Sequence, residues 1–399
     1  MNLQLYGEVK SWKKPIHKSK MALARAYLKL LSNVEIIGIA GSVGKTLTQN
    51  AVHSVLSQKF PTVVGEENLD PTFRIPQTIL KTKPWHKYMI LEYGIEHPGE
   101  MDYYTQLVTP KYALLTIISP EHTRYFENIQ GVLNEESKII INLPKSAYAL
   151  LNADDPYAHQ ISKLSKATVV WFGQRAKRGV KISHYKQNLH GASFRMHYGG
   201  EVAVVKWKVI GHHQLTSAYA AATLGILSGL TLKQIAKGLS GVKSPEHRLN
   251  LKITEHVNIL DDTYNSSPKA ALESIKTLVE VGKGKKKVAV LGEMRDLGGL
   301  SESAHTELGE QIAKTRINYL LTVGKIAGLI SISAKKAGFK GKILNVKNTK
   351  ETLVNLKSYI SPKAVFLIKG SRHEHLERIV LGLTHKSTAI ECYHCGKLK

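Results

Sequence analysis

Cysteine is nearly absent from this chain of 399 residues, which contains two: Cys392 and Cys395. A pair of cysteines cannot form the disulfide framework of a small secreted domain. Their spacing is that of half a zinc knuckle, and a complete site would need further ligands, for which His385 and His394 are the nearest candidates. We favour a solvent-exposed tail over residues 386–399, with a metal site as the alternative.

Long apolar runs are also absent. No run approaches the roughly 18–20 residues that span a bilayer. The N-terminus lacks an apolar stretch followed by a small-residue cleavage site, so it does not read as a secretory signal. We therefore expect a cytoplasmic protein with no membrane span. Hydrophobic residues still make up 43% of the chain, which is enough for a large core, and the length predicts two or three domains.

Acidic residues are scarce, because 31 Asp and Glu stand against 56 Lys and Arg and give a formal net charge of +25. One interpretation is nucleic-acid binding. The other is a basic surface that attracts small anions such as nucleotides. The basic residues are scattered, and we find no helix-turn-helix pattern and no aromatic residues spaced for base stacking. We favour the second interpretation and expect no nucleic-acid partner.

What the sequence does contain is a regular alternation of short apolar runs with helix-like segments. This alternation is typical of βαβ units with a parallel sheet, and it predicts an α/β fold. The predicted strands are Val34–Ala40, Tyr88–Glu92, Tyr112–Ile117, Val257–Leu260, Lys287–Leu291, Tyr319–Val323, Lys342–Asn345 and Ala364–Ile368. The predicted helices are Ala22–Leu31, Glu100–Leu107, Asn128–Leu143, Leu215–Leu230 and a stretch that begins at Lys45.

Two further features divide the chain. Residues 180–210 alternate in short stretches broken by glycines, which predicts antiparallel hairpins. The polar stretch Lys243–His247, which contains Pro245, predicts a domain boundary. The predicted organisation is a short basic arm (1–33), a central domain with a mostly parallel sheet (34–245), a Rossmann-like α/β domain (246–385) and a tail (386–399).

The most informative local motif is Gly38-Ile39-Ala40-Gly41-Ser42-Val43-Gly44-Lys45-Thr46, where a strand runs into a glycine-rich turn and a helix follows. Glycines let backbone N–H groups converge on phosphate oxygens, and the helix N-terminus adds its dipole. Lys45 would neutralise the β- and γ-phosphates, while the Thr46 hydroxyl would bind Mg²⁺. Ile39 stands where the usual pattern has glycine, although the shorter Gly-x-x-Gly-Lys-Thr fits. A chance Gly-Lys-Thr on a surface loop is the alternative.

Further motifs follow in a definite order along the chain. They are Leu91-Glu92-Tyr93-Gly94, His97-Pro98-Gly99-Glu100, Pro120-Glu121-His122, Asn134-Glu135-Glu136-Ser137-Lys138, Asn152-Ala153-Asp154-Asp155, Gly211-His212-His213, Asp261-Asp262-Thr263-Tyr264-Asn265-Ser266-Ser267-Pro268, Leu291-Gly292-Glu293-Met294 and Lys369-Gly370-Ser371-Arg372. In this order and spacing the motifs resemble the Mur ligase family, and within it the members that add D-alanyl-D-alanine. The resemblance covers about residues 34 to 385.

The resemblance implies an ATP-dependent, Mg²⁺-dependent ligase that forms C–N bonds, with a P-loop ATPase domain in the centre. ATP would convert a substrate carboxylate to an acyl phosphate, which an amine then attacks. The substrates implied are a UDP-linked muramoyl tripeptide and D-alanyl-D-alanine, used in peptidoglycan precursor synthesis. No protein nucleophile is required, since phosphoryl transfer depends mainly on placement and on cations beside the developing charge.

The family's roles in the central domain pass to residues that match its motifs. The residues that would contact the ATP phosphates are Gly41, Ser42, Val43, Gly44, Lys45 and Thr46. Glu92 would share the nucleotide's Mg²⁺ with Thr46, and His122 would help bind a second Mg²⁺. Lys138 matches a lysine that is carbamylated in several members, where the carbamate bridges metal ions. The simpler alternatives are a surface salt bridge for Glu92, a turn cap for His122 and plain solvation for Lys138.

In the C-terminal domain, Arg248 would reach the ATP phosphates, completing the expected catalytic set of Lys45, Glu92, His122, Lys138 and Arg248. The residues expected near the adenosine are Asp262, Tyr264 and Asn265. The residues expected near the amine substrate are His305, Lys369 and Ser371. Arg248 paired with an acidic side chain, Tyr264 as a core aromatic and His305 as a helix-face histidine are the simpler alternatives.

One departure from the family concerns the start of the chain. The resembling ligases carry an N-terminal domain that grips the UDP moiety, whereas only about 33 residues precede the first predicted strand here. We expect that UDP is bound differently, that a partner protein supplies this function, or that the acceptor is another compound. The alternatives within the family are ligases of the polyglutamate or cyanophycin type. Outside it, a non-catalytic nucleotide-binding module and a nucleic-acid-stimulated ATPase are the alternatives.

Overall fold

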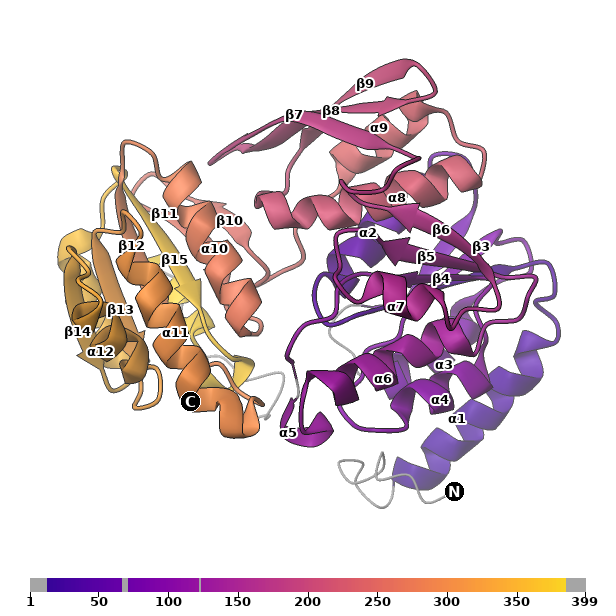
Figure 1. Ribbon diagram of the computed structural model, residues 1–399, viewed down its shortest axis with the longest axis horizontal. Coiled ribbons are helices and arrows are strands. Elements are labelled where there is room, and N and C mark those ends of the chain that lie inside the picture. The colour runs from indigo at the N-terminus through magenta and orange to yellow at the C-terminus, as the bar shows by residue number, and fades with distance from the viewer. Residues whose placement is uncertain (1–12, 67–70, 122, 385–399) are drawn as a thin grey trace. The chain divides into compact units, whose positions relative to one another are not determined.

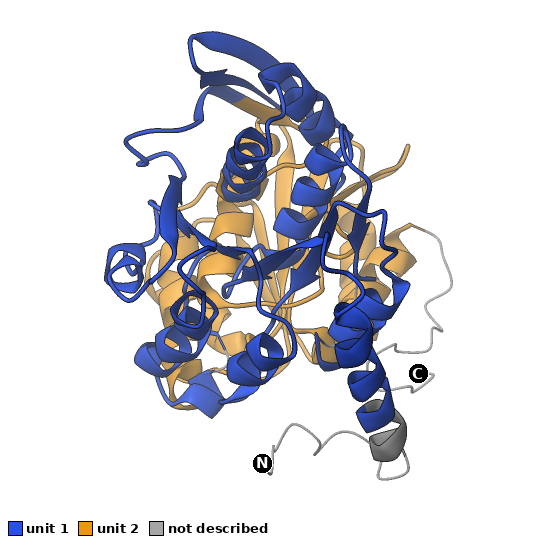
Figure 2. Ribbon diagram, turned by 90° about the vertical axis from the view of Figure 1, so that its right-hand side faces the viewer, with its two compact units in different colours: residues 1–185, 193–207, 214–243 blue, residues 186–192, 208–213, 244–399 orange. Residues whose placement is uncertain are grey.

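The computed structural model of this chain describes residues 13–66, 71–121 and 123–384, and it forms two compact units (Figures 1 and 2). Unit 1 comprises residues 1–185, 193–207 and 214–243, and unit 2 comprises residues 186–192, 208–213 and 244–399. Each unit contains its own sheet and its own buried apolar core.

Unit 1 is built on a six-stranded sheet in which every pairing is parallel. Its strands are β1 (Glu35–Ala40), β2 (Thr62–Val64), β3 (Tyr88–Glu92), β4 (Tyr112–Leu115), β5 (Tyr148–Asn152) and β6 (Thr168–Phe172), in the order β2-β3-β1-β4-β5-β6. The central strands β3 and β4 are buried along their whole length, because helices cover both faces of a parallel sheet. Their near-continuous apolar sequences, Tyr-Met-Ile-Leu-Glu and Tyr-Ala-Leu-Leu, follow from this burial.

The helices of unit 1 lie in two layers (Figure 1). They are α1 (Lys13–Leu28), α2 (Lys45–Leu56), α3 (Pro71–Lys81), α4 (Glu100–Leu107), α5 (Thr123–Phe126), α6 (Ile129–Ile141), α7 (Ala158–Ser162), α8 (Leu215–Leu227) and α9 (Leu232–Gly241). The first layer contains α2, α8 and α9, which pack on one another, and the second contains α3, α4 and α6 on the opposite face. The predicted hairpins are present as the sheet β7 (Lys181–Asn188), β8 (Gly191–Tyr198) and β9 (Glu201–Trp207).

The first helix differs from its prediction. The sequence predicts a helix over Ala22–Leu31 within a short arm, whereas α1 begins at Lys13 and ends at Leu28. Ala24 is fully buried, α1 packs on α3, and the Tyr27 hydroxyl donates to the Thr82 carbonyl oxygen at 2.9 Å. The tertiary contact therefore stabilises a longer helix than the apolar pattern alone indicates.

Unit 2 contains a second six-stranded sheet, in the order β10-β11-β15-β12-β13-β14. Its strands are β10 (Asn250–Ile253), β11 (Asn258–Asp262), β12 (Lys286–Leu291), β13 (Tyr319–Val323), β14 (Lys342–Val346) and β15 (Ala364–Lys369). Its helices are α10 (Pro268–Val281), α11 (Ser301–Ala313), α12 (Gly328–Lys336), α13 (Thr349–Leu356) and α14 (Glu377–Leu383). The edge strand β10 is antiparallel and the other strands are parallel.

Side chains alternate across the sheet of unit 2. In β15, Val365 and Leu367 enter one apolar cluster, while Phe366 and Ile368 enter the cluster on the other face. One-turn 3-10 helices occur at His212–Gln214, Gly298–Leu300, Lys357–Tyr359 and Arg372–Glu374. The predicted α/β fold, with a mostly parallel central sheet and a Rossmann-like second sheet, is confirmed.

The strand order of unit 1 also contains a switch point. The strands β2 and β3 lie on one side of β1, and the chain then crosses to β4, β5 and β6 on the other side, so β3 and β4 flank β1. In open parallel sheets, ligands bind outside the carboxyl ends of the strands at such a switch point. The residues that follow β1 and β4 and the last residue of β3 meet at this edge.

Candidate functional site

The loop between β1 and α2 has the shape of an anion-binding turn. It runs from Gly41 to Gly44, both of which have positive φ angles, of 117° and 86°. A Cβ at Gly41 would collide with the Thr116 hydroxyl oxygen, so the loop requires glycine there. The same hydroxyl donates to the Val43 carbonyl oxygen at 2.8 Å, which fixes the loop against the end of β4.

The start of α2 presents backbone N–H groups at this switch point. Among the described residues, the N–H groups of residues 43–47 have no acceptor; those of residues 44–47 belong to the N-cap and first turn of the helix, and Val43 precedes them. Together with the helix dipole, they make a site for a phosphate group. Lys45 Nζ donates to the carbonyl oxygens of Gly41 at 2.6 Å and Ser42 at 3.3 Å, so its charge lies over the loop.

The first two loop residues use their N–H groups inside the protein. Gly41 N–H donates to Glu136 Oε2 at 2.8 Å, and Ser42 N–H donates to the Ile117 carbonyl oxygen at 2.7 Å. The Ser42 hydroxyl also exchanges hydrogen bonds with the backbone of Ser119. Of the predicted phosphate contacts, Val43, Gly44, Lys45 and Thr46 therefore have their amide groups available, whereas Gly41 and Ser42 shape the loop.

Thr46 and Glu92 meet beside the loop, although 46 residues separate them in sequence. The Thr46 hydroxyl donates to Glu92 Oε2 at 3.0 Å, and Arg74 Nη2 lies 3.3 Å from the same oxygen. Arg74 and Glu92 are 4% and 7% exposed, so they form a buried ion pair. Hydroxyl and carboxylate oxygens are the hard ligands that Mg²⁺ prefers, so these two side chains fit the expected cation. Sequence reasoning missed Arg74.

The two other predicted metal ligands are His122 and Lys138. His122 lies outside the described residues. Lys138 Nζ lies 2.7 Å from Asp102 Oδ2 and 2.8 Å from Glu135 Oε2. Burial by itself lowers the pKa of Lys138, but the hydrogen bonds to Asp102 and Glu135 outweigh it and raise the pKa above its ordinary value. Lys138 therefore stands in the structure as a paired cation between α6 and α4.

Glu136 faces the loop from the same helix, and sequence reasoning missed it as well. It is 1% exposed, and its carboxylate accepts the Gly41 N–H. Burial raises its pKa to about 7, against the opposing effects of Lys45 and of the Gly41 hydrogen bond. The sequence did contain a signal for this orientation. Glu135 and Lys138 are three residues apart and can pair on one face of the helix, which leaves Glu136 on another face.

In unit 2, Arg248 and Tyr264 are brought together. The guanidinium carbon of Arg248 lies 3.7 Å from the centre of the Tyr264 ring, and that of Arg372 lies 4.7 Å from it. Arginine over an aromatic face is a favourable cation–π contact. Arg248 is thus held by an aromatic ring rather than by the acidic partner that the simpler interpretation proposed for it.

Asp262, Asn265 and Lys369 form a second group in unit 2. Lys369 Nζ lies 2.8 Å from Asp262 Oδ2 and donates to the Asn265 carbonyl oxygen at 2.9 Å. Asp262 also accepts hydrogen bonds from the Leu249 N–H at 3.0 Å and the Ser274 hydroxyl at 2.6 Å. This network fixes the segment that follows β11, on which Tyr264 stands.

His305 and Ser371 lie at the carboxyl ends of β12 and β15. His305 is fully buried, with Nε2 accepting the Met294 N–H at 3.0 Å and Nδ1 2.6 Å from the Ser301 carbonyl oxygen. Burial lowers its pKa, which favours the neutral ring that this bonding requires. Ser371 N–H donates to the Glu293 carbonyl oxygen at 2.9 Å. Both ring nitrogens of His305 are thus engaged with the backbone.

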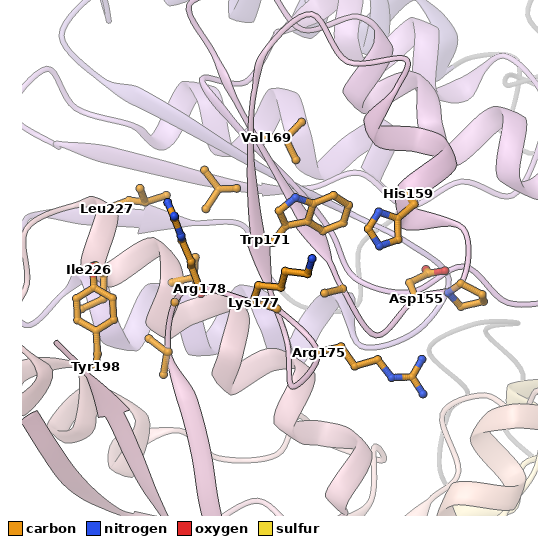
Figure 3. Close-up of a pocket in the computed structure, with 17 residues that line it drawn as sticks. Asp155, His159, Val169, Trp171, Arg175, Lys177, Arg178, Tyr198, Ile226 and Leu227 are labelled. Atoms are coloured by element: carbon orange, nitrogen blue, oxygen red, sulfur yellow. The ribbon is translucent and has the colours of Figure 1, made fainter. Parts of the chain in front are cut away.

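A pocket of about 840 Å³ lies elsewhere in unit 1, along β6 and the loop that follows it (Figure 3). Trp171 and His159 form part of its wall, with ring centroids 4.7 Å apart, and Arg175, Lys177 and Arg178 contribute positive charge. None of its lining residues belongs to the predicted site. The phosphate loop is therefore a different feature from this pocket.

The remaining expectations concern metal ligands and a membrane span. No group of three or more His, Cys, Asp or Glu side chains converges on a metal position within residues 13–66, 71–121 and 123–384. A cation at the loop would take further ligands from phosphate and water, as Mg²⁺ commonly does. Cys392 and Cys395 lie outside the described residues. In the described part of the chain, no helix is both long enough and apolar enough to span a bilayer.

Family models match both units. The Mur ligase middle domain matches residues 39–225, and the Mur ligase, glutamate ligase domain matches residues 247–372. The UDP-N-acetylmuramoyl-tripeptide--D-alanyl-D-alanine ligase of Bacillus subtilis (strain 168) is 30% identical over 365 residues, covering 90% of this chain and 78% of that protein. The protein of the same name from Buchnera aphidicola subsp. Baizongia pistaciae (strain Bp) is 29% identical, covering 92% and 79%.

Solved structures resemble this chain in fold. Crystal structure I of MurF from Acinetobacter baumannii has a TM-score of 0.83 at 25% identity, covering 93% of this chain and 81% of that chain. MurF ligase from Thermotoga maritima, solved in complex with ADP, has a TM-score of 0.82 at 23% identity, which is a likeness of fold. The chain belongs to the Mur ligase family.

Proposed function

We propose that this chain is an ATP-dependent ligase that joins D-alanyl-D-alanine to a UDP-N-acetylmuramoyl-tripeptide. The observation that carries the proposal is the start of α2, where unpaired backbone N–H groups and Lys45 stand beside the Thr46–Glu92 pair. The two proposed substrates are those named for the relatives from Bacillus subtilis and Buchnera aphidicola.

The reaction has two steps. A carboxylate oxygen of the tripeptide attacks the γ-phosphorus of ATP, and the bond to the β–γ bridging oxygen breaks, so that ADP leaves. The amine of D-alanyl-D-alanine then attacks the carbonyl carbon of the acyl phosphate. Inorganic phosphate leaves with the electron pair of the broken C–O bond, and the amine loses a proton as the amide forms. Each step requires placement and charge stabilisation rather than a protein nucleophile.

The residues of unit 1 would bind and orient the triphosphate. The N–H groups of residues 43–47 would donate to phosphate oxygens, and Lys45 would move its charge from the loop carbonyls to the γ-phosphate. Thr46 and Glu92 would hold Mg²⁺, which supplies positive charge beside the oxygens of the transferred group. Arg74 would hold the Glu92 carboxylate in position.

The residues of unit 2 carry the remaining expected roles. Arg248 would bind phosphate, and Tyr264, which stacks on it, would position the guanidinium. Asp262 and Asn265 would contact the adenosine. His305, Lys369 and Ser371 would line the place of the amine substrate, where the two engaged nitrogens of His305 suit a positioning role rather than proton transfer.

The test is phosphate release by the purified chain with Mg·ATP, UDP-muramoyl-tripeptide and D-alanyl-D-alanine. Release should require both substrates and should match amide formation mole for mole. Panels of other acids and amines, including glutamate and folate-type acceptors, are the comparison arms. Activity with another pair alone would transfer the proposal to that pair, and stimulation by single-stranded RNA or DNA instead would overturn it.

The location and the partner expected from the sequence are part of this proposal. A cytoplasmic location is proposed because both substrates are small precursors and the chain consumes ATP. The similarity to the relatives gives no support for a partner protein that binds the UDP moiety, so the assay uses the chain alone. Addition of a lysate fraction that restored activity with the UDP-linked substrate would support such a partner.

A further inference from the structure

Helix α6 carries Glu135, Glu136 and Lys138 within one turn. Successive residues of an α-helix are rotated by about 100°. Glu135 and Lys138, three residues apart, therefore share a face, whereas Glu136 and Lys138, two apart, point to nearly opposite sides. Only one of these two side chains can face the phosphate loop.

Lys138 faces α4. Its amine contacts Asp102 and Glu135, and the other oxygen of Glu135 accepts the N–H groups of Gly99 at 2.9 Å and Met101 at 3.0 Å. Addition of carbon dioxide to this amine would replace a cation by an anion beside two carboxylates. Like charges at such distances repel strongly, so this arrangement opposes carbamylation.

Glu136 faces the loop. Its bond from the Gly41 N–H, 2.8 Å long, is the one hydrogen bond found for its carboxylate in the described part of the chain. No Lys, Arg or His of that part lies within ion-pair distance of it, although Lys45 contributes positive charge from farther away. A carboxylate that is 1% exposed is costly to ionise without a close cation. Glu121 and Glu135 add further negative charge nearby.

We propose that Glu136 supplies the negative charge that holds a divalent cation beside the phosphate loop, so that metal binding here does not depend on a carbamylated lysine. This inference rests on the proposed function, because the cation would be bound together with the nucleotide. A carboxylate oxygen is a suitable ligand for Mg²⁺ or Mn²⁺, directly or through water. The competing role is purely one of shape, in which Glu136 only anchors Gly41.

The experiment measures Mn²⁺ binding to the full chain with a non-hydrolysable ATP analogue, by electron paramagnetic resonance of the free ion. Glu136→Gln keeps an oxygen that accepts the Gly41 N–H but removes the charge. It should bind Mn²⁺ roughly 10- to 100-fold more weakly, the range typical of losing a group that supports a metal site. Lys138→Arg keeps the pairing with Asp102 and Glu135 but has no amine to carbamylate, and it should bind Mn²⁺ as the wild type does.

A measurement without any variant accompanies these. Removing dissolved carbon dioxide and adding bicarbonate should both leave the Mn²⁺ affinity of the wild type unchanged, and intact mass spectra should show no carbon dioxide adduct. Unchanged affinity in a folded Glu136→Gln protein would overturn the inference, as would weakened binding in Lys138→Arg or rescue by bicarbonate. A wild-type chain that fails to bind the ATP analogue would instead overturn the proposed function.

Discussion

Lys45 is the residue whose replacement separates nucleotide binding from folding. Its amine contacts only the carbonyl oxygens of Gly41 and Ser42 among the described residues, so few packing contacts depend on it. Lys45→Ala should weaken binding of an ATP analogue roughly 10- to 100-fold, as expected for losing hydrogen bonds to a charged group. Calorimetric titration measures this. Lys45→Arg, which keeps the charge, should lose less, and equal affinity in all three proteins would contradict the phosphate role.

The ion pair of Arg74 with Glu92 leads to a stability prediction. Both side chains are buried, so removing the carboxylate leaves a buried guanidinium without its partner at 3.3 Å. Glu92→Ala should lower the free energy of unfolding by about 3–5 kcal/mol, measured by urea denaturation. Thr46→Val removes only the hydroxyl that donates to the same Glu92 oxygen and should lower the free energy of unfolding by about 1 kcal/mol. Equal losses in the two variants would contradict this.

His305 gives a pH dependence of defined sign. Because burial lowers its pKa, the folded state binds fewer protons than the unfolded chain, whose histidine titrates near about 6.5. Its contribution to stability is present above that pH and is lost as the pH falls. Denaturation at pH 7 and pH 5 should therefore show a smaller acid loss in His305→Asn than in the wild type. His247, whose pKa is raised by a hydrogen bond to Asp261, is the control and should show the opposite change.

Several of these residues could be predicted from the sequence because phosphate loops place glycine, lysine and threonine in a fixed order between a strand and a helix. Lys45, Thr46 and Glu92 come together where the strand pattern implies, at the carboxyl ends of β1 and β3. Matching a motif by letters cannot resolve a two-residue shift on a helix, so it does not show that Glu136, rather than Lys138, faces the phosphate loop. Arg74 lies on α3, which no motif marks, and its partner follows only from tertiary packing.

At the scale of elements, some strands have their predicted bounds and others were not predicted. The strands β3 and β13 have the predicted bounds, because both are continuous apolar runs between polar ends. The strand β2 has three residues and the edge strands β10 and β14 are only partly buried, so their sequences carry weak signals. The strands β2 and β10 were not predicted, and neither were β5 and β6, although β5 is largely buried. For β2 and β10, pairing with a neighbouring strand, rather than local pattern, makes them strands.

Helix α1 provides a test of an element that the sequence described as an arm. Ala24 is fully buried where α1 meets the core of unit 1, and its neighbour Leu23 is 59% exposed. Ala24→Asp places a carboxylate in that core and should lower the free energy of unfolding by about 2 kcal/mol or more. Leu23→Asp, one residue away on the exposed side, should change it by less than about 0.5 kcal/mol. Urea denaturation distinguishes them, and equal effects would mean that α1 does not pack on the core.

At the scale of the whole molecule, the domain boundaries predicted from the sequence remain a proposal. The contacts of the chain change from unit 1 to unit 2 between Lys243 and Ser244, and residues 186–192 and 208–213 also belong to unit 2. A single boundary at 245/246 therefore simplifies a chain that passes between the units several times. Periodicity along the sequence does not show such crossings, because they depend on which core a short segment joins.

The segment at Lys243 should accept an insertion if it is the boundary. Lys243 is exposed, residues 242–245 have no helical or strand structure, and the N–H groups of Lys243 and Ser244 have no acceptor among the described residues. Inserting Gly-Ser-Gly after Lys243 should lower the free energy of unfolding by less than about 1 kcal/mol, because lengthening a loop costs little entropy. The same insertion after the fully buried Ala221, inside α8, should unfold unit 1, since it shifts every later side chain of that helix by most of a turn. Thermal and urea unfolding compare the two proteins, and a large loss from the insertion at Lys243 would show that this segment is held as part of a continuous core.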